Sequence, residues 1–542
     1  MLGFNPFSSG LFGLKSIYVN WETPIRAFGS KAFWGVDTES CTLYVPKGTY
    51  DKYQEATGWS RFKNIVEYEN KVTVTLSKAG TLPDKIGKIE KYYIDNLKVI
   101  GDINGTDLRM IRSMAGCDYE GNRTGRLAKL DLSEANIVSG GDPYYKYSYF
   151  DSKDSCSYKD SCYTENNKIG KCAFNLCSQL TSINMPSNIT EIDSAAFNFC
   201  HSLKSIVIPS SVTKIGAWAF MWCDSLTSIN IPESVTKIGV SAFGSCKSRT
   251  SINIPTSVTE IGDKAFSGCS SLTSIDIPSS VTKINLATFM YCDSLTSINI
   301  PTSVTEIGSK AFSGCSSLTS IDIPTSVTEI GSRAFGYCKS LTSINLPKSI
   351  TEISDWAFEN CSSLTSINIP ESVTKIGSDA FYGCSSLTSI NIPERVDTIW
   401  GLAFSGCSKL QTLSLPSAVK LVGYNNFYDC ENLTSVYANS NTPPEIEEPY
   451  NQDFFDKCNL AERCTLYVPK GSAEAYSSSN WHLYFNNIKE FDTETGVHVT
   501  EASSQPAELS RHDINGRKIE KPAKGLNIIK YSDGSVRKEF AK

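Results

Sequence analysis

The sequence predicts a solenoid, a curved stack of 23-residue turns joined by one parallel β-sheet. Twelve cysteines lie on one arithmetic series with a step of 23 residues, from Cys177 to Cys430. A phenylalanine precedes each of them by three residues, and eleven prolines keep the same step from Pro186 to Pro416. Self-similarity at a fixed period of this length is the signature of a repeat protein in which each turn contacts only its neighbours.

One turn, residues 226–246, reads LTSINIPESVTKIGVSAFGSC. The alternation in Ser-Ile-Asn-Ile predicts a short strand with Ile229 and Ile231 inward and Asn230 outward, and Pro232 ends it because proline has no N–H to pair. A period of 23 with the pattern L-x-x-I-x-I lies in the range of leucine-rich repeats. The predicted fold class is therefore a leucine-rich repeat solenoid with capped ends and a small β tail.

In most turns a glycine follows the third isoleucine of the repeat, as Gly239 does. Asp193 and Asn285 replace this glycine in two turns. These residue types predict a left-handed backbone at that position. Ser354 and Trp400 occupy the same position and do not fit this interpretation.

The ends of the array and an interruption divide the chain. Residues 41–68 and 464–491 both begin with CTLYVPKG, which predicts two C-terminal caps. Between Tyr68 and Ile169 the pattern is irregular, with a helix expected from Pro83 to Tyr93. The expected parts are 1–70, the last turn and cap of an upstream array; 71–138, an N-terminal cap and atypical first turns; 139–168, a tyrosine-rich insertion; 169–460, regular repeats; 461–491, a C-terminal cap; 492–506, a linker; and 507–542, a small β module with hairpin turns at Asn515-Gly516 and Asp533-Gly534.

Composition excludes several classes of function. The formal net charge of −6 argues against a nucleic-acid partner, which needs a basic surface. No run of eighteen apolar residues is present, so no membrane-spanning segment is expected. The four histidines have no partners at diagnostic spacings, which predicts a non-enzymatic protein without cofactor or metal. Residues 102–107 fail the spacing of a calcium loop and favour a helix cap before Leu108 instead.

The cysteine at a fixed inward position of each turn is predicted to fill the core as a buried thiol, with disulfides or metal ligation as less favoured alternatives. Cys156 and Cys162 lie outside the series, in CSYKDSC. A local disulfide between them is an open possibility for an exported protein.

The array, the two CTLYVPKG segments and DLSEANIV at residues 131–138 together resemble the BspA-like leucine-rich repeat surface proteins of gut and oral anaerobic bacteria. The tail DINGRKIEKPAKGLNIIKYSDGSVRK is similar to the C-terminal secretion and sorting modules of proteins from the same bacteria. The resemblance implies an extracellular or surface-attached bacterial protein of a family associated with adhesion to host matrix proteins. It implies no catalytic residues and no cofactor.

Two surfaces are candidate binding sites. The insertion concentrates aromatic residues beside aspartates, as recognition surfaces do, although it could instead be a lid over the first turns. The outward strand position forms a Ser/Asn grid on the expected concave face, which could bind a polysaccharide or simply solvate the sheet. The insertion residues are Tyr144, Tyr145, Tyr147, Tyr149, Phe150 and Tyr158, and the concave-face residues are Asn230, Asn253, Asp276, Asn299, Asp322 and Asn345.

A further aromatic group, Phe199, Trp218, Met221 and Trp222, is expected to pack on the convex side. Together these features favour an adhesin-like protein that binds a host extracellular matrix or cell-surface protein. A carbohydrate-binding module and a structural spacer are the alternatives. Because the sequence predicts a cap at each end of the array, we expect a monomer.

Overall fold

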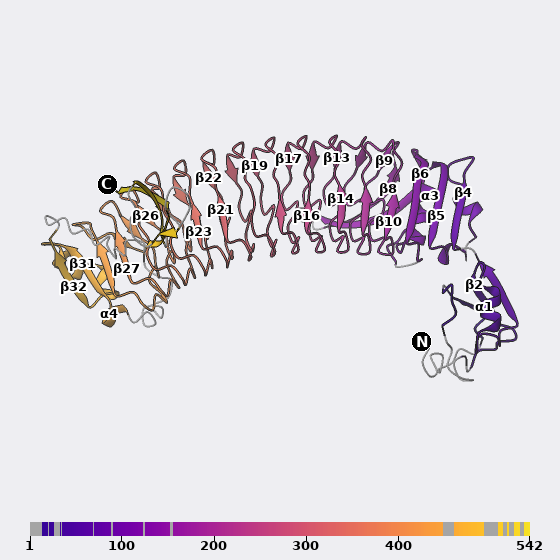
Figure 1. Cartoon of the computed structure of the whole chain (residues 1–542), viewed down its shortest axis with the longest axis horizontal. Coiled ribbons are helices and arrows are strands. Elements are labelled where there is room, and N and C mark those ends of the chain that lie inside the picture. Colours follow the sequence, from indigo (N-terminus) through magenta and orange to yellow (C-terminus); the bar gives the residue numbers. More distant parts are fainter. Residues whose placement is uncertain are drawn as a thin grey trace.

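The structure is a computed structural model that describes residues 13–19, 21–25, 33, 35–68, 70–87, 90–122, 125–151, 156–447 and 460–492, and the strands of the tail. Figure 1 shows a long curved array, with the N-terminal residues at one end and the strands of the second CTLYVPKG segment at the other. Successive turns pair in parallel and in register 23 residues apart, as Ile206 pairs with Ile229. The predicted leucine-rich repeat solenoid is confirmed.

The first strand of most turns begins with Ser-Ile, with the isoleucine buried and its neighbours outward. The first strands are β10 Ser182–Asn184, β12 Ser205–Val207, β14 Ser228–Asn230, β16 Ser251–Ile252, β18 Ser274–Ile275, β21 Ser320–Asp322, β23 Ser343–Asn345, β27 Thr412–Leu415 and β29 Ser435–Ala438. Strands β27 and β29 have Leu413 and Val436 at the buried position instead. Where the row has no named strand, single parallel bridges continue it, including Asp276 with Asn299 and Asn368 with Asn391.

A second row of short parallel strands runs beside the first, which corrects the expectation of one sheet. After the proline the chain turns, and a Lys/Glu–Ile pair meets the same pair of the neighbouring turn. These strands are β9 Lys168–Ile169, β11 Glu191–Ile192, β13 Lys214–Ile215, β15 Lys237–Ile238, β17 Glu260–Ile261, β19 Lys283–Ile284, β20 Glu306–Ile307, β22 Glu329–Ile330, β24 Glu352–Ile353, β25 Lys375–Ile376, β26 Thr398–Ile399, β28 Leu421–Val422 and β30 Glu445–Ile446. Two-residue strands carry too little alternation to be seen in the sequence.

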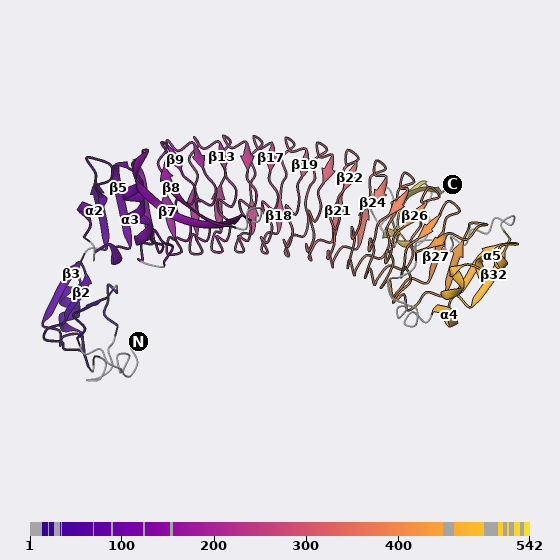
Figure 2. The ribbon, with the colours of Figure 1, turned by 180° about the vertical axis from the view of Figure 1, so that it is seen from behind.

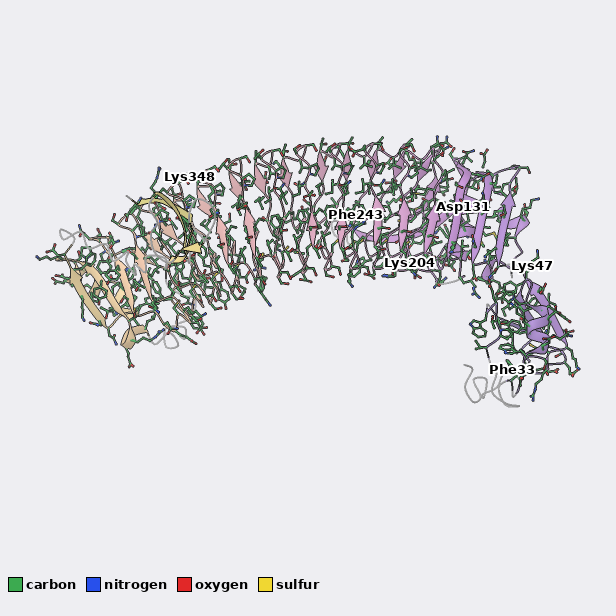
Figure 3. All side chains as sticks on the ribbon, viewed as in Figure 1. Phe33, Lys47, Asp131, Lys204, Phe243 and Lys348 are labelled. Atoms are coloured by element: carbon green, nitrogen blue, oxygen red, sulfur yellow. The ribbon has the colours of Figure 1, made fainter. Side chains whose placement is uncertain are left out.

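The core is a column of stacked phenylalanine rings flanked by rows of buried isoleucine, leucine and cysteine. From Phe174 to Phe404, consecutive ring centroids lie 5.2 to 5.8 Å apart with nearly parallel planes. Phe243, marked in Figure 3, is one of these rings and is fully buried. Each ring rests on the rings of two neighbouring turns, so the turns fold only as a stack.

The recurring glycine lies where adjacent turns pack closely, and the predicted left-handed backbone at that position is wrong. A Cβ on Gly239 would lie 2.5 Å from the carbonyl carbon of Gly216, and one on Gly262 would lie 2.7 Å from that of Gly239. The positive φ angles lie elsewhere in the turn, at non-glycine residues such as Ser241 and Lys264. The glycine therefore allows adjacent backbones to approach each other.

Two of the residues that replace this glycine have a structural reason. In glycine turns the glycine N–H donates to an isoleucine carbonyl of the preceding turn, as from Gly308 to Ile284. The Ser354 hydroxyl donates instead to the carbonyl of Ile330 at 2.6 Å, and Asn285 Nδ2 donates to that of Ile261 at 2.6 Å. Trp400 keeps the backbone bond, and nothing in the structure explains its size.

The N-terminal residues form a separate three-stranded parallel sheet in the order β1-β2-β3. It has its own core around Leu43, Tyr53 and Trp59. Its elements are β1 Ser16–Tyr18, β2 Thr42–Pro46, α1 Tyr50–Glu55 and β3 Asn64–Tyr68. A new sheet, β4-β5-β6 and onward to β14, begins after it.

The irregular segment before the array contains β4 Lys71–Thr75, α2 Leu82–Lys85, η1 Glu90–Tyr92, β5 Asn96–Ile103, α3 Gly105–Met114 and β6 Lys129–Ile137. The helix expected from Pro83 to Tyr93 is wrong, because α2 stops where Ile86 adopts an extended backbone. The cap before α3 is confirmed. Asn104 accepts from the Thr106 N–H, and Asp107 accepts from the N–H groups of Asn104, Gly80 and Leu82.

The insertion is an antiparallel hairpin of β7 Gly140–Asp151 and β8 Cys156–Thr164. Figure 2 shows it lying across one broad side of the array, from the first turns toward the middle. The array ends with α4 Leu460–Arg463, β31 Thr465–Pro469, α5 Ala473–Ser477, η3 Asn480–Leu483 and β32 Asn487–Phe491. The tail forms an antiparallel sheet of β33 Glu508–His512, β34 Lys518–Ile519, β35 Gly525–Tyr531 and β36 Val536–Ala541.

Candidate functional site

The third side of each turn, from the recurring glycine position to the cysteine, is called the turn face here; Gly216–Cys223 is one example. Alternate residues of this segment donate N–H groups to the following turn, as Trp218 donates to Val240 and Trp222 to Gly244. Two positions in nearly every turn adopt left-handed backbone, with φ of 56° at Trp218 and 61° at Trp222. Side chains at these positions differ in exposure, from the buried Ala287 to the exposed Trp218.

Exposed apolar side chains gather on the turn face. Trp218 is 46% exposed and Tyr291 is 55% exposed. Val207, which is also exposed, lies instead on the first row of strands, in β12. The group around Trp218 was expected to pack against the array, and for Trp218 itself this expectation is wrong because its side chain is exposed. Phe199, Met221 and Trp222 are half-buried. The exposed members of the turn face are Trp218, Val240, Leu286, Tyr291, Tyr337 and Trp400.

Charged groups border the aromatic group at its start. His201 Nδ1 lies 2.7 Å from a carboxylate oxygen of Asp224, and Lys247 Nζ lies 3.7 Å from the other oxygen. The Lys247 ammonium also lies 4.9 Å from the centre of the Trp222 ring, which in turn stacks on Phe199. Aromatic anchors with a polar rim are the composition of protein-binding surfaces.

The base of the hairpin is anchored in the core, so two of the predicted contact residues are not available to a ligand. Tyr144 is fully buried and its hydroxyl donates to the carbonyl of Lys171 at 2.6 Å. Tyr145 is 7% exposed and accepts from Asn175 Nδ2 at 3.2 Å. Burial raises the pKa of both phenols. These two residues fulfil the alternative role, that of a cover over the first turns.

A buried arginine completes the anchor. Arg112 on α3 donates to the carbonyls of Cys172 at 2.6 Å, Ala173 at 2.9 Å and Asn175 at 3.1 Å. Its guanidinium also lies 4.2 Å from the centre of the Tyr145 ring. Helix α3, the hairpin and the first regular turn are therefore joined by one side chain, which sequence reasoning missed because these contacts are not periodic.

The remaining predicted contact residues belong to the outer part of the hairpin. The backbone pairs Tyr147 with Asp160, Tyr149 with Tyr158, and Phe150 with Ser157. The side chains of Tyr147, Tyr149, Phe150 and Tyr158 lie outside the described residues. Tyr163, near the base, is 56% exposed.

A disulfide between Cys156 and Cys162 is incompatible with the hairpin. Both lie on β8, which is extended from Cys156 to Thr164. Six residues of extended strand span about 20 Å, whereas a disulfide needs Cα atoms within about 7 Å. Cys162 instead lies beside Cys172 and is buried.

The predicted concave-face residues form an exposed row on the first strands, here called the strand face. All six, from Asn230 to Asn345, are exposed. Three of them, Asp276, Asn299 and Asp322, line a hollow of about 500 Å³ together with Ser274, Ser297 and Thr302. Carboxylate, amide and hydroxyl groups so arranged offer hydrogen bonds to a polyhydroxylated ligand.

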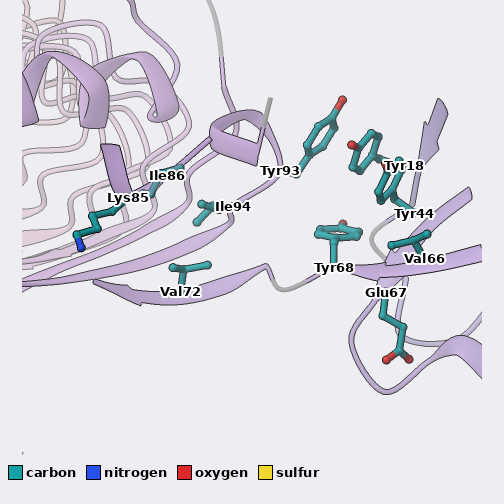
Figure 4. Close-up of a pocket in the computed structure, with 10 residues that line it drawn as sticks. All are labelled: Tyr18, Tyr44, Val66, Glu67, Tyr68, Val72, Lys85, Ile86, Tyr93 and Ile94. Atoms are coloured by element: carbon teal, nitrogen blue, oxygen red, sulfur yellow. The ribbon is translucent and has the colours of Figure 1, made fainter. Parts of the chain in front are cut away.

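A second hollow, of about 530 Å³, lies where the N-terminal sheet meets the array (Figure 4). Tyr18 stacks on Tyr44 with centroids 4.1 Å apart, and Tyr93 of the array stacks on Tyr18. Burial raises the pKa of Tyr68, at the edge of this group, to about 12. Sequence reasoning missed this cluster, although Tyr44 and Tyr68 recur in the second cap as Tyr467 and Phe491.

Metal clusters and membrane-spanning helices are both absent from the described part of the chain. There, no three His, Cys, Asp or Glu side chains come close enough together to hold a metal ion. None of its helices is both long and apolar enough to cross a membrane.

A sequence profile of the BspA type leucine rich repeat region matches residues 153–270, 236–365 and 362–465, as six copies. These ranges together span more than half of the chain. The chain belongs to the BspA-type leucine-rich repeat family. Family members are typically associated with bacterial surfaces and typically lack catalytic activity, which supports a surface or protein-interaction role.

Solved structures of leucine-rich repeat proteins are similar to this BspA-type chain. A leucine-rich repeat protein from Bacteroides ovatus is 26% identical, with 65% of this chain and 99% of that chain covered and a TM-score of 0.47. A leucine rich cell surface protein from Faecalibacterium prausnitzii is 25% identical, with 68% and 98% covered and a TM-score of 0.38. The T. pallidum leucine rich repeat protein is 31% identical, with 38% and 77% covered and a TM-score of 0.28. No curated protein matches the chain.

Proposed function

We propose that this BspA-type protein is an extracellular or surface-attached bacterial binding protein, adhesin-like, that recognises a host matrix or cell-surface protein without catalysis. The observation that carries the proposal is the hairpin β7–β8, fixed at its base and extended along the array. Anchored by Tyr144, Tyr145 and Arg112, it is held rigidly at one end, which reduces the entropy lost on binding.

The turn face supports the same proposal because it varies from turn to turn. Its positions carry tryptophan, tyrosine, leucine, serine, lysine and glycine in different turns, whereas the strand face has Asn or Asp in most turns, with Val207 and Ser414 as exceptions. A specific protein ligand needs a surface with a unique pattern of anchors. The exposed Trp218 and Tyr291 provide such anchors.

Polysaccharide binding on the strand face is the alternative, and the hollow around Asp276, Asn299 and Asp322 favours it. Repeated Asn and Ser side chains at one-turn spacing would match a ligand that is itself repetitive. Its predicted site lies on a different side of the turn from Trp218, so mutations separate the two candidates.

The test is a solid-phase panel of matrix proteins and polysaccharides, probed with the intact chain and with a shortened hairpin. Because Ser148 pairs with Lys159, residues 149–158 can be replaced by Asn-Gly, which closes the two strands while Tyr144, Tyr145 and Cys162 stay in place. Circular dichroism confirms that both proteins fold alike.

Saturable binding to a protein that the shortened hairpin loses supports the proposal. Polysaccharide binding that survives the shortening and is lost in Asp276→Ala and Asp322→Ala assigns function to the strand face. Silence across the whole panel favours the structural spacer.

The tail is proposed as the sorting-type module that the sequence suggests. Its four-stranded antiparallel sheet is separate from the parallel sheets of the array. Removal of residues 507–542 in the producing bacterium is expected to keep the protein inside the cell or to release it from the surface. Unchanged surface display of the truncated protein contradicts this role.

A further inference from the structure

Two thiols meet where the hairpin joins the array. Cys162, near the base of β8, lies beside Cys172, which is in the first turn of the regular array. Both side chains are largely buried but keep a small solvent-exposed fraction, 5% for Cys162 and 7% for Cys172. No disulfide joins the cysteines that the structure describes.

Neighbouring contacts fix this pair from both sides. On the hairpin, Tyr145 pairs with Cys162 across the two strands, and the adjacent Tyr144 bonds to Lys171, the residue before Cys172. On the array, Arg112 donates to the carbonyl of Cys172 itself. The same anchor that fixes the hairpin therefore keeps the two cysteines next to each other.

The cysteine ladder has a different environment. From Cys200 to Cys430 each thiol donates to the carbonyl of the phenylalanine 26 residues earlier, at 3.1 to 3.4 Å. These residues are fully buried, and desolvation raises the pKa of thiols such as Cys223, Cys315 and Cys384 well above the ordinary value. A thiol that cannot ionise or reach solvent does not exchange with disulfides.

The electrostatics divide the roles within the pair. The neighbouring Cys162 thiol lowers the pKa of Cys172, burial opposes this shift, and the Arg112 guanidinium acts in the same direction as Cys162. The Cys172 thiol in turn raises the pKa of Cys162, and burial adds to this effect. We therefore assign the role of attacking thiolate to Cys172.

We propose that Cys162 and Cys172 form a reversible disulfide that fastens the β7–β8 hairpin to the array. The oxidant is a low-molecular-weight disulfide. The Cys172 thiolate attacks one of its sulfurs, which forms a mixed disulfide and releases one thiolate. Cys162 then loses its proton and attacks the Cys172 sulfur, which releases the second small thiol. The protein loses two hydrogens, and the small disulfide is reduced to two thiols.

The disulfide would make hairpin attachment dependent on the redox state of the surroundings. In an oxidising environment the base of β8 is covalently held, and in a reducing one it is held by noncovalent contacts, including those of Tyr144, Tyr145 and Arg112. This inference is independent of which ligand the protein binds.

The test uses the full chain, reduced and then incubated with oxidised glutathione. Remaining thiols are alkylated, and disulfide-linked peptides are identified by mass spectrometry after digestion. The expected result is one predominant cross-link, between Cys162 and Cys172, that dithiothreitol reverses. Limited proteolysis of the hairpin should be at least severalfold slower in the oxidised than in the reduced protein.

Variants supply the controls. Cys162→Ser should leave a glutathione adduct on Cys172, and Cys172→Ser should give no cross-link, while Cys315→Ser in the ladder should cross-link as the native protein does. The proposal is overturned if the native protein forms no Cys162–Cys172 cross-link, or if Cys156 or ladder cysteines are linked in comparable yield. Equal proteolysis of the hairpin in both states overturns the fastening role.

Discussion

The thiol of Cys315 donates a hydrogen bond to the carbonyl oxygen of Phe289, 3.2 Å away in the preceding turn. The same carbonyl also accepts the N–H of Cys292, so both of its lone pairs are used. Cysteine is therefore more than a small apolar filler at this position. It is a compact residue that also donates a hydrogen bond between turns, which explains why the position repeats along the whole array.

Replacing this cysteine separates its two contributions. Cys315→Ala removes the donor and leaves a small void, so we expect the free energy of unfolding to fall by about 1 to 3 kcal/mol. Cys315→Ser keeps a donor and should lose less. Urea denaturation followed by circular dichroism measures both. An alanine variant as stable as the native protein would show that the hydrogen bond contributes nothing.

The close approach of adjacent turns predicts opposite results at two nearby positions. A Cβ at residue 262 would lie 2.7 Å from the Gly239 carbonyl carbon, so Gly262→Ala should destabilise the protein by about 1 to 3 kcal/mol. Lys264 has a φ of 56°, so Lys264→Gly should stay within about 1 kcal/mol of the native protein. Thermal denaturation of both variants makes the comparison. If Gly262→Ala were tolerated and Lys264→Gly were strongly destabilising, the left-handed interpretation of the glycine would be supported instead.

Arg249 occupies the position that leucine holds in the neighbouring turns, at Leu226 and Leu272. It is 1% exposed, and its Nε and Nη1 atoms have no hydrogen-bond partner. Burial lowers the pKa of its guanidinium. Arg249→Leu should therefore raise the free energy of unfolding by about 1 to 4 kcal/mol. Leu272→Met, a change of similar volume without charge, is the matched control, and a destabilised leucine variant would contradict the account.

Asp379 predicts a pH-dependent difference in stability. Burial raises the pKa of its carboxyl from the ordinary 3.8 to about 6, with Glu359 and Asp355 acting in the same direction and Arg333 opposing them. The folded state then holds the proton more tightly, so the contribution is favourable below pH 4 and is lost as the pH rises through 6. Asp379→Asn should gain melting temperature relative to the native protein at pH 7 and show no gain at pH 4. A difference that does not change with pH would mean that Asp379 titrates normally.

The sequence was sufficient for the period of the array and for its first row of strands, but not for the second row or for the role of the recurring glycine. The 23-residue step of Phe and Cys predicted the stack of turns, and the Ser-Ile-Asn alternation predicted the first row of strands. Contacts that occur once, such as Arg112 with Tyr145 or Cys162 with Cys172, leave no period and were missed. Tyr144 and Tyr145 were grouped with the other insertion aromatics because their burial depends on α3 and the first turn, which are distant or irregular in sequence.

Arg249 and the turn face were accessible to sequence reasoning but needed a different comparison. Reading each repeat position down the array shows one arginine in a row of leucines, and shows that variation concentrates between the recurring glycine and the cysteine. Which side chains of that segment project outward depends on the left-handed backbone at residues such as Trp218, and a propensity scale does not predict such angles for tryptophan.

The central claim is that the turn face, with the hairpin, binds a protein ligand, and point mutations on the two faces test it most directly. Binding affinity for the protein ligand found in the panel is measured for Trp218→Ser and Tyr291→Ser, and for the strand-face controls Asn299→Ala and Asp322→Ala. The account predicts that one or both turn-face variants lose about tenfold in affinity, as exposed aromatic anchors do, while the controls change less than about twofold. Loss in the strand-face variants with native affinity in both turn-face variants would contradict it.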